Sequence, residues 1–234
     1  MMNRSVVILS ALGSPLLGPV LRTLAKNDVT VSGVLLDGEL PARDRERIQS
    51  RMTPGYKVEG PADFDFSDVP FYFVKNHNSA NALKILQQLK PSYILNAGTP
   101  RILKRPILEV SLGVLNCHPG LLPKYRGCTC VEWAIFHNDP VGASVHFMTE
   151  GIDEGPVVTT RAMKIQSGES YETVRTRMVE FTAELLAEAT ASALHANLTR
   201  DRMPAQEAGS YFKPISDADL QIVKEKLSTG AYSC

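Results

Sequence analysis

Short apolar runs alternate with amphipathic segments along the first half of the chain. The runs typical of strands cover 6–9, 29–36, 71–74, 93–97 and 112–118, and glycine, proline or polar turn residues follow them. Between them, 16–25 and 79–89 carry apolar residues at helical spacing. Because strands alternate with helices, the pattern predicts an α/β fold. The sheet is expected to be open, mostly parallel and doubly wound (Rossmann-like), with helices on both faces.

The second half continues with a predicted helix at 131–137 and strands at 143–148 and 157–165. A long helix is expected over 170–198, with an apolar stripe that we expect to pack across the sheet: Tyr171, Val174, Met178, Phe181 and Leu185. Residues 1–200 are therefore interpreted as the main domain. The tail 201–234, with a short helix at 217–227, is interpreted as an extension packed on the same domain.

Ser14 and Pro15 stand where the N-cap and the first residue of the 16–25 helix are expected. The glycine spacing of 13–18 is that of a phosphate loop, but Pro19 and Val20 follow in place of Lys and Ser or Thr. No dinucleotide fingerprint follows the first strand either. A nucleotide-binding loop of either kind is therefore not expected here.

Charge and composition narrow the class of protein. The formal net charge is +0, which weighs against a nucleic-acid partner, tRNA included, although a local basic patch is compatible with it. A hydrophobic fraction of 44% and a charged fraction of 21% are typical of globular proteins. The apolar run near the start is too short for a signal peptide or a membrane span. A cytoplasmic protein with no membrane partner is expected.

The four cysteines do not have the spacing of a metal site. Cys128 and Cys130 are separated by one residue, and no second pair of ligands at finger spacing follows them. We therefore expect no metal, and interpret the cysteines as free thiols in a reducing compartment.

Asn116 and His118 mark the candidate reaction site. They lie on one face of the 112–118 strand, because side chains alternate along a strand, and Cys117 lies on the other. They also stand at the carboxyl end of that strand, where ligands bind in open α/β sheets. The alternative for this pair is a capping asparagine and a hydrogen-bonded core histidine.

Asp153 lies in a tight loop, 151–155, that follows the 143–148 strand. If the two strands are neighbours, its carboxylate comes close to His118, raises the pKa of the imidazole and orients the ring. The alternative is an ordinary loop aspartate. His146, in the middle of its strand, is interpreted as a structural residue.

Three motifs taken together resemble the formyltransferases that use 10-formyltetrahydrofolate: Asn-x-His-Pro-Gly-Leu-Leu-Pro, Tyr-Arg-Gly and Gly-Ile-Asp-x-Gly-Pro. The resemblance covers about 93–165. It implies a formyltransferase fold with 1–200 as the catalytic domain, and Asn116, His118 and Asp153 as the catalytic residues. It also implies a folate slot lined by Pro100, Arg101, Ile102, Leu103, Glu150, Gly151 and Ile152. The acceptor contacts that it implies are Pro119, Gly120 and Tyr125.

Formyl transfer to an amine passes through a tetrahedral intermediate that carries an oxyanion, and donors aimed at that oxygen give the largest rate gain. The Asn116 amide and a protonated His118 would supply such donors. Asp153 would stabilise the cationic imidazole and help to move the proton of the attacking amine. This chemistry requires neither a metal nor a covalent nucleophile.

The acceptor is expected to be a small-molecule amine. Sugar N-formyltransferases, which act on nucleotide-linked amino sugars, have a Trp-containing helix similar to 131–135 and are the best match. A glycinamide ribonucleotide or other small-amine formyltransferase and a formyltetrahydrofolate hydrolase are the alternatives. Methionyl-tRNA formyltransferases carry a further basic domain, which is not expected here.

Two further points are left open by the sequence. The arginines of 42–52 are interpreted as a solvated face, the alternative being that some reach an acceptor phosphate: Arg43, Arg45, Arg47 and Arg51. The tail could lie on the sheet or form a subunit contact, so a homodimer also stays open.

Overall fold

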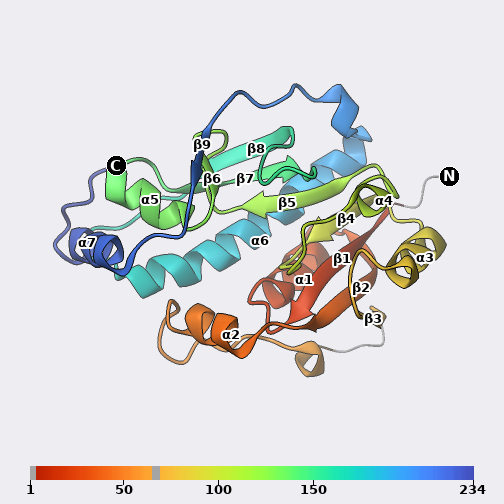
Figure 1. Cartoon of the computed structure of the whole chain (residues 1–234), viewed down its shortest axis with the longest axis horizontal. Coiled ribbons are helices and arrows are strands. Elements are labelled where there is room, and N and C mark those ends of the chain that lie inside the picture. The colour runs from red at the N-terminus through yellow and green to blue at the C-terminus, as the bar shows by residue number, and fades with distance from the viewer. Residues whose placement is uncertain (1–3, 65–68) are drawn as a thin grey trace.

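A seven-stranded sheet forms the centre of the computed structural model, which describes residues 4–64 and 69–234. Its order is β3-β2-β1-β4-β5-β7-β8 (Figure 1). The strands are β1 (Ser5–Leu12), β2 (Thr30–Glu39), β3 (Phe71–Val74), β4 (Tyr93–Asn96), β5 (Val114–His118), β7 (Gly142–Phe147) and β8 (Val157–Ala162). The pairs from β3 to β5 are parallel, whereas β7 runs antiparallel to both β5 and β8. The predicted mostly parallel α/β sheet is confirmed. The sequence between the predicted strands 29–36 and 71–74 is polar and interrupted by prolines and glycines, and residues 65–68 of it lie outside the described residues.

Helices cover both faces of the sheet, as predicted. The larger hydrophobic cluster joins one face to α1 (Leu17–Lys26) and α6 (Tyr171–Ala196). A smaller cluster joins the other face to α3 (Ala80–Leu89) and α4 (Arg105–Leu108). Two cores form because the central parallel strands are apolar on both sides, as strands buried between helix layers usually are.

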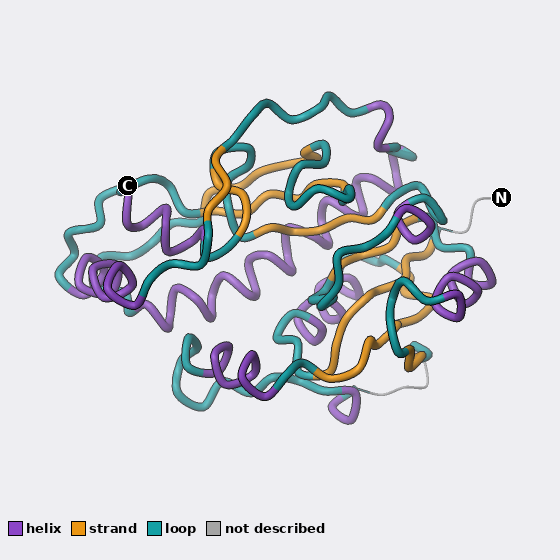
Figure 2. The backbone as a smooth tube through the Cα atoms, viewed as in Figure 1, coloured by secondary structure: helices purple, strands orange, loops and turns teal. Residues whose placement is uncertain are grey.

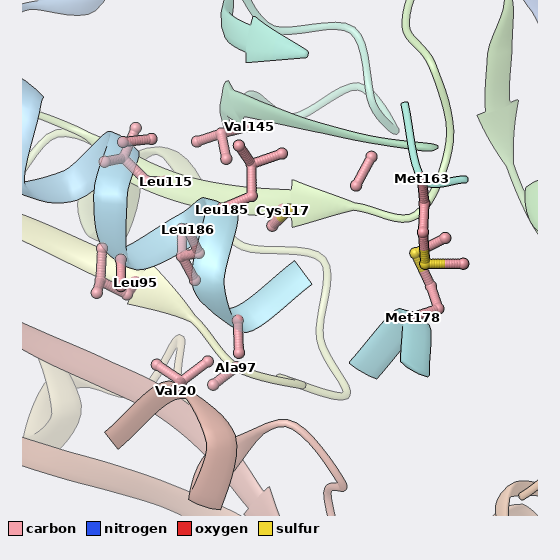
Figure 3. Packing of buried hydrophobic residues seen from close by; sticks show 14 of the residues in the cluster. Val20, Leu95, Ala97, Leu115, Cys117, Val145, Met163, Met178, Leu185 and Leu186 are labelled. Carbon is pink, nitrogen blue, oxygen red and sulfur yellow. The ribbon is translucent and has the colours of Figure 1, made fainter. Parts of the chain in front are cut away.

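The long helix α6 crosses one face of the sheet (Figure 1). Its N-cap Ser170 accepts a hydrogen bond from the backbone N–H of Thr173, which satisfies one of the free donors of the first turn. Leu185 and Leu186 pack among Leu95, Leu115 and Val145 in the larger core (Figure 3). The predicted stripe is buried at Tyr171, Val174, Met178 and Leu185, with Phe181 partly exposed.

The N-cap predicted for α1 is absent. The helix begins at Leu17 and its N-cap is Leu16, with no side-chain capping bond. Ser14 instead donates its hydroxyl to the carbonyl oxygen of Ala97, at 2.8 Å. The serine is buried, and its hydroxyl oxygen also accepts from the Leu16 backbone N–H at 3.3 Å, so its donor and its acceptor are both used before the helix begins.

The tail returns across the molecule (Figure 2). Its strand β9 (Ser210–Phe212) pairs in parallel with β6 (Tyr125–Gly127), a small sheet that the sequence pattern did not predict. The tail helix α7 (Asp217–Ser228) then packs against α5 (Cys130–His137). The remaining α-helix of the described residues, α2 (Ala42–Gln49), has no buried residue: each of its side chains is exposed or partly exposed. The division into domain 1–200 and extension 201–234 stays a prediction.

The Tyr93 hydroxyl connects the sheet to the end of α6. It donates to the carbonyl oxygens of Ala193, at 3.0 Å, and Leu198, at 2.6 Å. We expect Tyr93→Phe to lower the free energy of unfolding by about 1–3 kcal/mol, because it removes hydrogen bonds to buried acceptors. Urea unfolding followed by circular dichroism measures this. The exposed Tyr211→Phe is the control, and an equal effect of both substitutions would contradict the prediction.

Candidate active site

Antiparallel pairing of β5 and β7 brings the predicted catalytic residues together. The register places His146 opposite Asn116 and Ser144 opposite His118, so β7 ends beside the start of β5, and the loop after it folds back toward His118. In this loop, the Asp153 carboxylate has its Oδ2 at 3.3 Å from Nδ1 of His118. The structure thus places Asn116, His118 and Asp153 in one site.

The loop that carries Asp153 is held from several sides. Asp153 has a positive φ of 53°, a conformation that aspartate adopts more readily than most residues. Gly155 packs so tightly on β7 that a Cβ there would lie 1.7 Å from the carbonyl oxygen of Phe147. The Gly127 amide donates to Asp153 Oδ2 at 2.9 Å, and the Gln206 side chain donates to the Asp153 backbone carbonyl at 3.1 Å. Strand β6 and the tail therefore both position the carboxylate.

A chain of side-chain amides orients Asn116. The backbone N–H groups of Gly98 and Thr99 donate to Oδ1 of Asn96, at 3.0 and 2.8 Å, which leaves Asn96 Nδ2 to donate to Asn116 Oδ1 at 2.9 Å. Asn116 Nδ2 then faces Nε2 of His146 at 3.0 Å. Since an amide nitrogen only donates, this Nε2 accepts, and the proton of His146 sits on Nδ1, which lies 3.0 Å from the Phe147 carbonyl. The second hydrogen of Asn116 Nδ2 stays available for a substrate.

Both ring nitrogens of His118 face oxygen atoms. Its Nε2 lies 2.9 Å from the carbonyl oxygen of Tyr125, which only accepts, so Nε2 carries a proton. Its Nδ1 faces the Asp153 carboxylate. Gly120 makes this packing possible, because a Cβ at this position would lie 2.6 Å from His118 Nε2 and 2.7 Å from the Tyr125 carbonyl oxygen.

Burial decides the charge of His118. The side chain is nearly inaccessible, and this burial lowers the pKa of the imidazole below its ordinary value, although the Asp153 carboxylate acts in the opposite direction. The carboxylate thus raises this pKa as expected, but burial outweighs it, and the protonated His118 expected from the sequence is not favoured. Burial also raises the pKa of Asp153, but His146, His118 and the Gly127 amide outweigh it and hold that pKa low. At neutral pH, the site contains a neutral imidazole beside an ionised carboxylate.

The first predicted folate segment follows β4 and is mostly exposed, including Pro100, Arg101 and Ile102, whereas Leu103 is buried in the smaller core. Arg101 binds Asp37 through its Nε, at 2.9 Å, and its Nη2, at 3.0 Å. Burial raises the pKa of Asp37, but Arg101 and the amide and ring of His77 lower it by more, so the pKa lies below its ordinary value. The bidentate pair anchors the segment at the end of β2.

The second predicted folate segment lies in the Asp153 loop, with Glu150 and Ile152 exposed and Gly151 partly so. Ile152 is 46% exposed and Ile102 is 65% exposed, although both are large apolar side chains. Each segment thus presents one uncovered isoleucine.

Of the predicted acceptor contacts, Pro119 is partly exposed, while Gly120 and Tyr125 are buried. The Tyr125 hydroxyl donates to the carboxylate of Asp139, so its backbone and not its phenol faces His118. The functional assignments of these residues and of the folate segments stay predictions.

The sequence interpretation missed two members of the site, His146 and Asn96. His146 was interpreted as structural, yet it is 2% exposed and contacts Asn116, with Nε2 3.5 Å from Asp153 Oδ1. Its place opposite Asn116 depends on strand register, which a single sequence does not reveal. Asn96 ends a strand next to β5, and its polarity after the apolar run Tyr93–Leu95 was the available signal.

The described part of the chain lacks the features of a metal site, a disulfide or a membrane span. There, no three His, Cys, Asp or Glu side chains gather as they would around a metal ion. All four cysteines are free thiols. Within the same residues, no helix combines the length and the apolar character that crossing a membrane requires.

A known protein family matches most of the chain. The sequence profile described as formyl transferase matches residues 3–190. The chain belongs to the formyl transferase family. The enzymes of this family use 10-formyltetrahydrofolate as the formyl donor.

Among curated relatives, the methionyl-tRNA formyltransferase of Methylacidiphilum infernorum is 35% identical over 144 residues, which are 60% of this chain and 44% of that protein. The methionyl-tRNA formyltransferase of Syntrophus aciditrophicus is 26% identical over 215 residues, covering 90% of this chain and 66% of that protein. The chain thus spans about half to two thirds of the length of these relatives.

Solved structures share the fold. Glycinamide ribonucleotide transformylase 1 from Symbiobacterium toebii aligns with a TM-score of 0.63 and 21% identity, over 88% of this chain and 95% of that one. A sugar N-formyltransferase from a Shewanella species aligns with a TM-score of 0.60 and 21% identity, over 92% of this chain and 78% of that one. The formyltransferase fold is thereby confirmed.

The titration of His118 tests the electrostatics of the site. We expect the NMR signal of its imidazole to titrate with a midpoint below the ordinary value of 6.5, because burial disfavours the cation. In Asp153→Asn the midpoint should fall further, since the carboxylate that favours the cation is gone. The spectrum of His118→Gln assigns the signal. A wild-type midpoint above 6.5, or a rise in Asp153→Asn, would contradict this description of the site.

The close approach of Gly120 to the imidazole gives a second prediction. Gly120→Ala would place a methyl group 2.6 Å from Nε2 and displace the His118 ring. Activity should fall roughly 100-fold, as expected for a misplacement of about 1 Å in a reaction site. Gly168→Ala is the control, because a Cβ there has open space, although its positive φ will cost some stability. Equal activity of Gly120→Ala and the wild type would refute this role.

Proposed function

We propose that the protein transfers a formyl group from 10-formyltetrahydrofolate to the primary amine of a small molecule, and that this molecule is a nucleotide-linked amino sugar. The observation that carries the proposal is the convergence of Asn116, His118 and Asp153 at the carboxyl edge of the sheet, with a distance of 3.3 Å between the imidazole and the carboxylate. This arrangement supplies one hydrogen-bond donor and one proton acceptor at the same point.

The proposal places the formyl donor between the two folate segments. Their uncovered side chains, Ile102 and Ile152, offer apolar contacts for a flat pterin ring. Backbone groups of Glu150 and Gly151 lie in the same loop as the catalytic carboxylate, so a ring bound there is close to Asp153. Arg101 is bound to Asp37, and its role in this proposal is to fix the first segment rather than to contact the donor.

In the reaction, the amine nitrogen attacks the formyl carbon and the carbonyl oxygen becomes an oxyanion. The free N–H of Asn116 Nδ2 donates to this oxygen, and its orientation is fixed in advance by Asn96 and His146. The neutral His118 accepts the amine proton at Nδ1, where the Asp153 carboxylate stabilises the imidazolium that forms. The intermediate then collapses, and N10 of the folate leaves with a proton returned from the same pair.

This assignment of roles differs from the one that the sequence suggested. A cationic His118 was expected to donate to the oxyanion, but burial keeps the free imidazole neutral and Tyr125 accepts its Nε2 proton. We therefore propose that Asn116 is the oxyanion donor and that His118 and Asp153 move the proton.

The amino-sugar acceptor is supported by two features. The helix α5 contains Trp133, as in sugar N-formyltransferases, and one such enzyme shares the fold over most of its length. Trp133 donates its indole N–H to the Lys213 carbonyl at 2.8 Å and so joins α5 to the tail. Glycinamide ribonucleotide is the second candidate acceptor, because a transformylase for it shares the fold over nearly its whole chain.

Variants of the three catalytic candidates test the reaction. We expect His118→Ala, Asp153→Asn and Asn116→Ala each to lower kcat by roughly 100- to 1000-fold, the range for loss of one oxyanion-hole donor. The control is Asp201→Asn, an exposed carboxylate outside the site, which should retain full activity. Rates within a factor of two of wild type for both His118→Ala and Asp153→Asn would refute the mechanism.

Acceptor identity is tested by mass spectrometry of reactions with 10-formyltetrahydrofolate. Nucleotide-linked amino sugars, glycinamide ribonucleotide and aminoacyl-tRNA are offered in separate reactions, and the mass gain of one formyl group is measured. The proposal predicts the fastest gain with an amino sugar. Formate release without any amine, at the rate of the best reaction, would instead indicate a hydrolase.

A further inference from the structure

A buried imidazole that the proposed reaction does not use contacts the residue before the first folate segment. His77 belongs to the loop between β3 and α3, and its side chain has no exposed surface. Its Nε2 lies 3.0 Å from the carbonyl oxygen of Leu35, which only accepts, so Nε2 carries a proton. Its Nδ1 lies 2.6 Å from the hydroxyl oxygen of Thr99. One side chain thus connects β2 to the residue that precedes Pro100.

The surroundings of His77 fix its charge and the direction of both hydrogen bonds. Burial lowers the pKa of the imidazole and Arg101 lowers it too, and together they outweigh the Leu35 carbonyl and the Asp37 carboxylate, which raise it. At neutral pH the ring is therefore neutral, with its proton on Nε2. The free Nδ1 only accepts, so the Thr99 hydroxyl donates to it.

Thr99 stands where two sets of hydrogen bonds meet. Its backbone N–H donates to Asn96 Oδ1 at 2.8 Å, at the start of the amide chain that orients Asn116. Its hydroxyl is bound by His77. Thr99 is partly exposed, so water is able to satisfy the hydroxyl without the imidazole. The bond to His77 is therefore not needed to satisfy this hydroxyl, and its effect is to hold Thr99 in place.

The neighbouring Asn78 holds the far end of the same segment. Its Nδ2 donates to the carbonyl oxygen of Ile102 at 3.0 Å, and its Oδ1 accepts from the backbone N–H of Lys104 at 2.7 Å. The loop between β3 and α3 therefore binds the segment on both sides, through His77 at Thr99 and through Asn78 beyond it.

Asp37 places the imidazole before it meets the segment. Its Oδ2 accepts from the backbone N–H of His77 at 2.9 Å, and the same oxygen binds Nε of Arg101 at 2.9 Å. The Nδ1 atom of His77 is 3.6 Å from this oxygen, which is too far for a hydrogen bond. The carboxylate thus fixes the backbone of the loop and leaves the imidazole nitrogen for Thr99.

We propose that His77 is a positioning residue for formyl transfer, and that its bond to the Thr99 hydroxyl holds the first folate segment in the conformation that binds the folate. The imidazole touches no reacting atom and acts only through Thr99. This role rests on the proposed function for the place of the folate, but the link between His77 and Thr99 is testable by itself.

Two amide substitutions separate the two hydrogen bonds of His77. Asparagine carries a polar atom near the position of Nδ1, and its side-chain oxygen accepts from the Thr99 hydroxyl. Glutamine carries its polar atoms near the position of Nε2, and so it reaches toward Leu35 instead. Both substitutions remove the ring from the same buried position. A difference between the two variants therefore reports the contact with Thr99 and not the loss of packing.

Kinetics with 10-formyltetrahydrofolate and the best amine acceptor measure this difference. We expect His77→Gln to raise KM for the folate roughly 3- to 10-fold, the effect of one lost hydrogen bond. The values of kcat and of KM for the acceptor should stay nearly unchanged, because the Thr99 amide keeps its bond to Asn96. His77→Asn should keep a KM for the folate close to that of the wild type. Lys75→Gln is the control, because Lys75 is an exposed residue of the same loop.

Equilibrium binding tests the link without turnover. Isothermal titration calorimetry measures the affinity for tetrahydrofolate in His77→Gln, in Thr99→Val and in the double variant. Each single substitution should weaken binding roughly 3- to 10-fold, and the double variant should bind no more weakly than the weaker single variant, because both remove one shared hydrogen bond. Thr99→Ser keeps the hydroxyl and should bind like the wild type. If His77→Gln fails to fold, the contrast between Thr99→Val and Thr99→Ser provides the same test.

The outcomes separate the positioning role from the proposed function. Tetrahydrofolate binding that weakens in His77→Gln and in Thr99→Val, without formylation of any amine, supports the positioning role and refutes the proposed function. Formylation of an amine, with KM for the folate unchanged in His77→Gln or raised equally in His77→Gln and His77→Asn, supports the function and overturns the positioning role. Additive losses of affinity in the double variant would overturn it as well.

Discussion

Pairing of β7 against β5 is the constraint on which the site depends. The antiparallel β7 places His146 directly opposite Asn116 and ends beside the start of β5. From there the following loop folds back and brings Asp153 to His118. The register is equally important. A slip of one residue would move His146 to the opposite face and replace it by Val145 or Phe147, and would separate Ser144 from the turn at Gly120–Leu122 that it binds.

The polar groups of the site are positioned by the backbone. The sequence of hydrogen bonds starts at the amides of Gly98 and Thr99, passes through Asn96 and Asn116, and ends at His146, so each amide has only one consistent orientation. His118 is held by the Tyr125 carbonyl and Asp153 by the Gly127 amide. Groups oriented in this way need little rearrangement when charge develops, which is the source of most electrostatic catalysis.

Buried carboxylates have different surroundings in this chain. Asp37 is bound by both nitrogens of an arginine fork and by a backbone amide, and its partners account for its charge. Glu132 is equally buried but stands at open distances from two arginines. Asp153 differs from both, since its carboxylate faces the imidazoles of His118 and His146.

The sequence by itself determined the order of strands and helices, the helix layers and three of the catalytic candidates. Periodicity reports which face of an element is buried, and the motifs around His118 and Asp153 are local in the chain, so both can be recognised without coordinates. Asn96, His146 and the small β6–β9 sheet were decided only by the tertiary structure. Each of these depends on register or on contacts between segments far apart in the chain. The lowered pKa of His118 was also decided by the tertiary structure. Burial is a property of the packed molecule, and here its effect outweighs that of the carboxylate beside the ring.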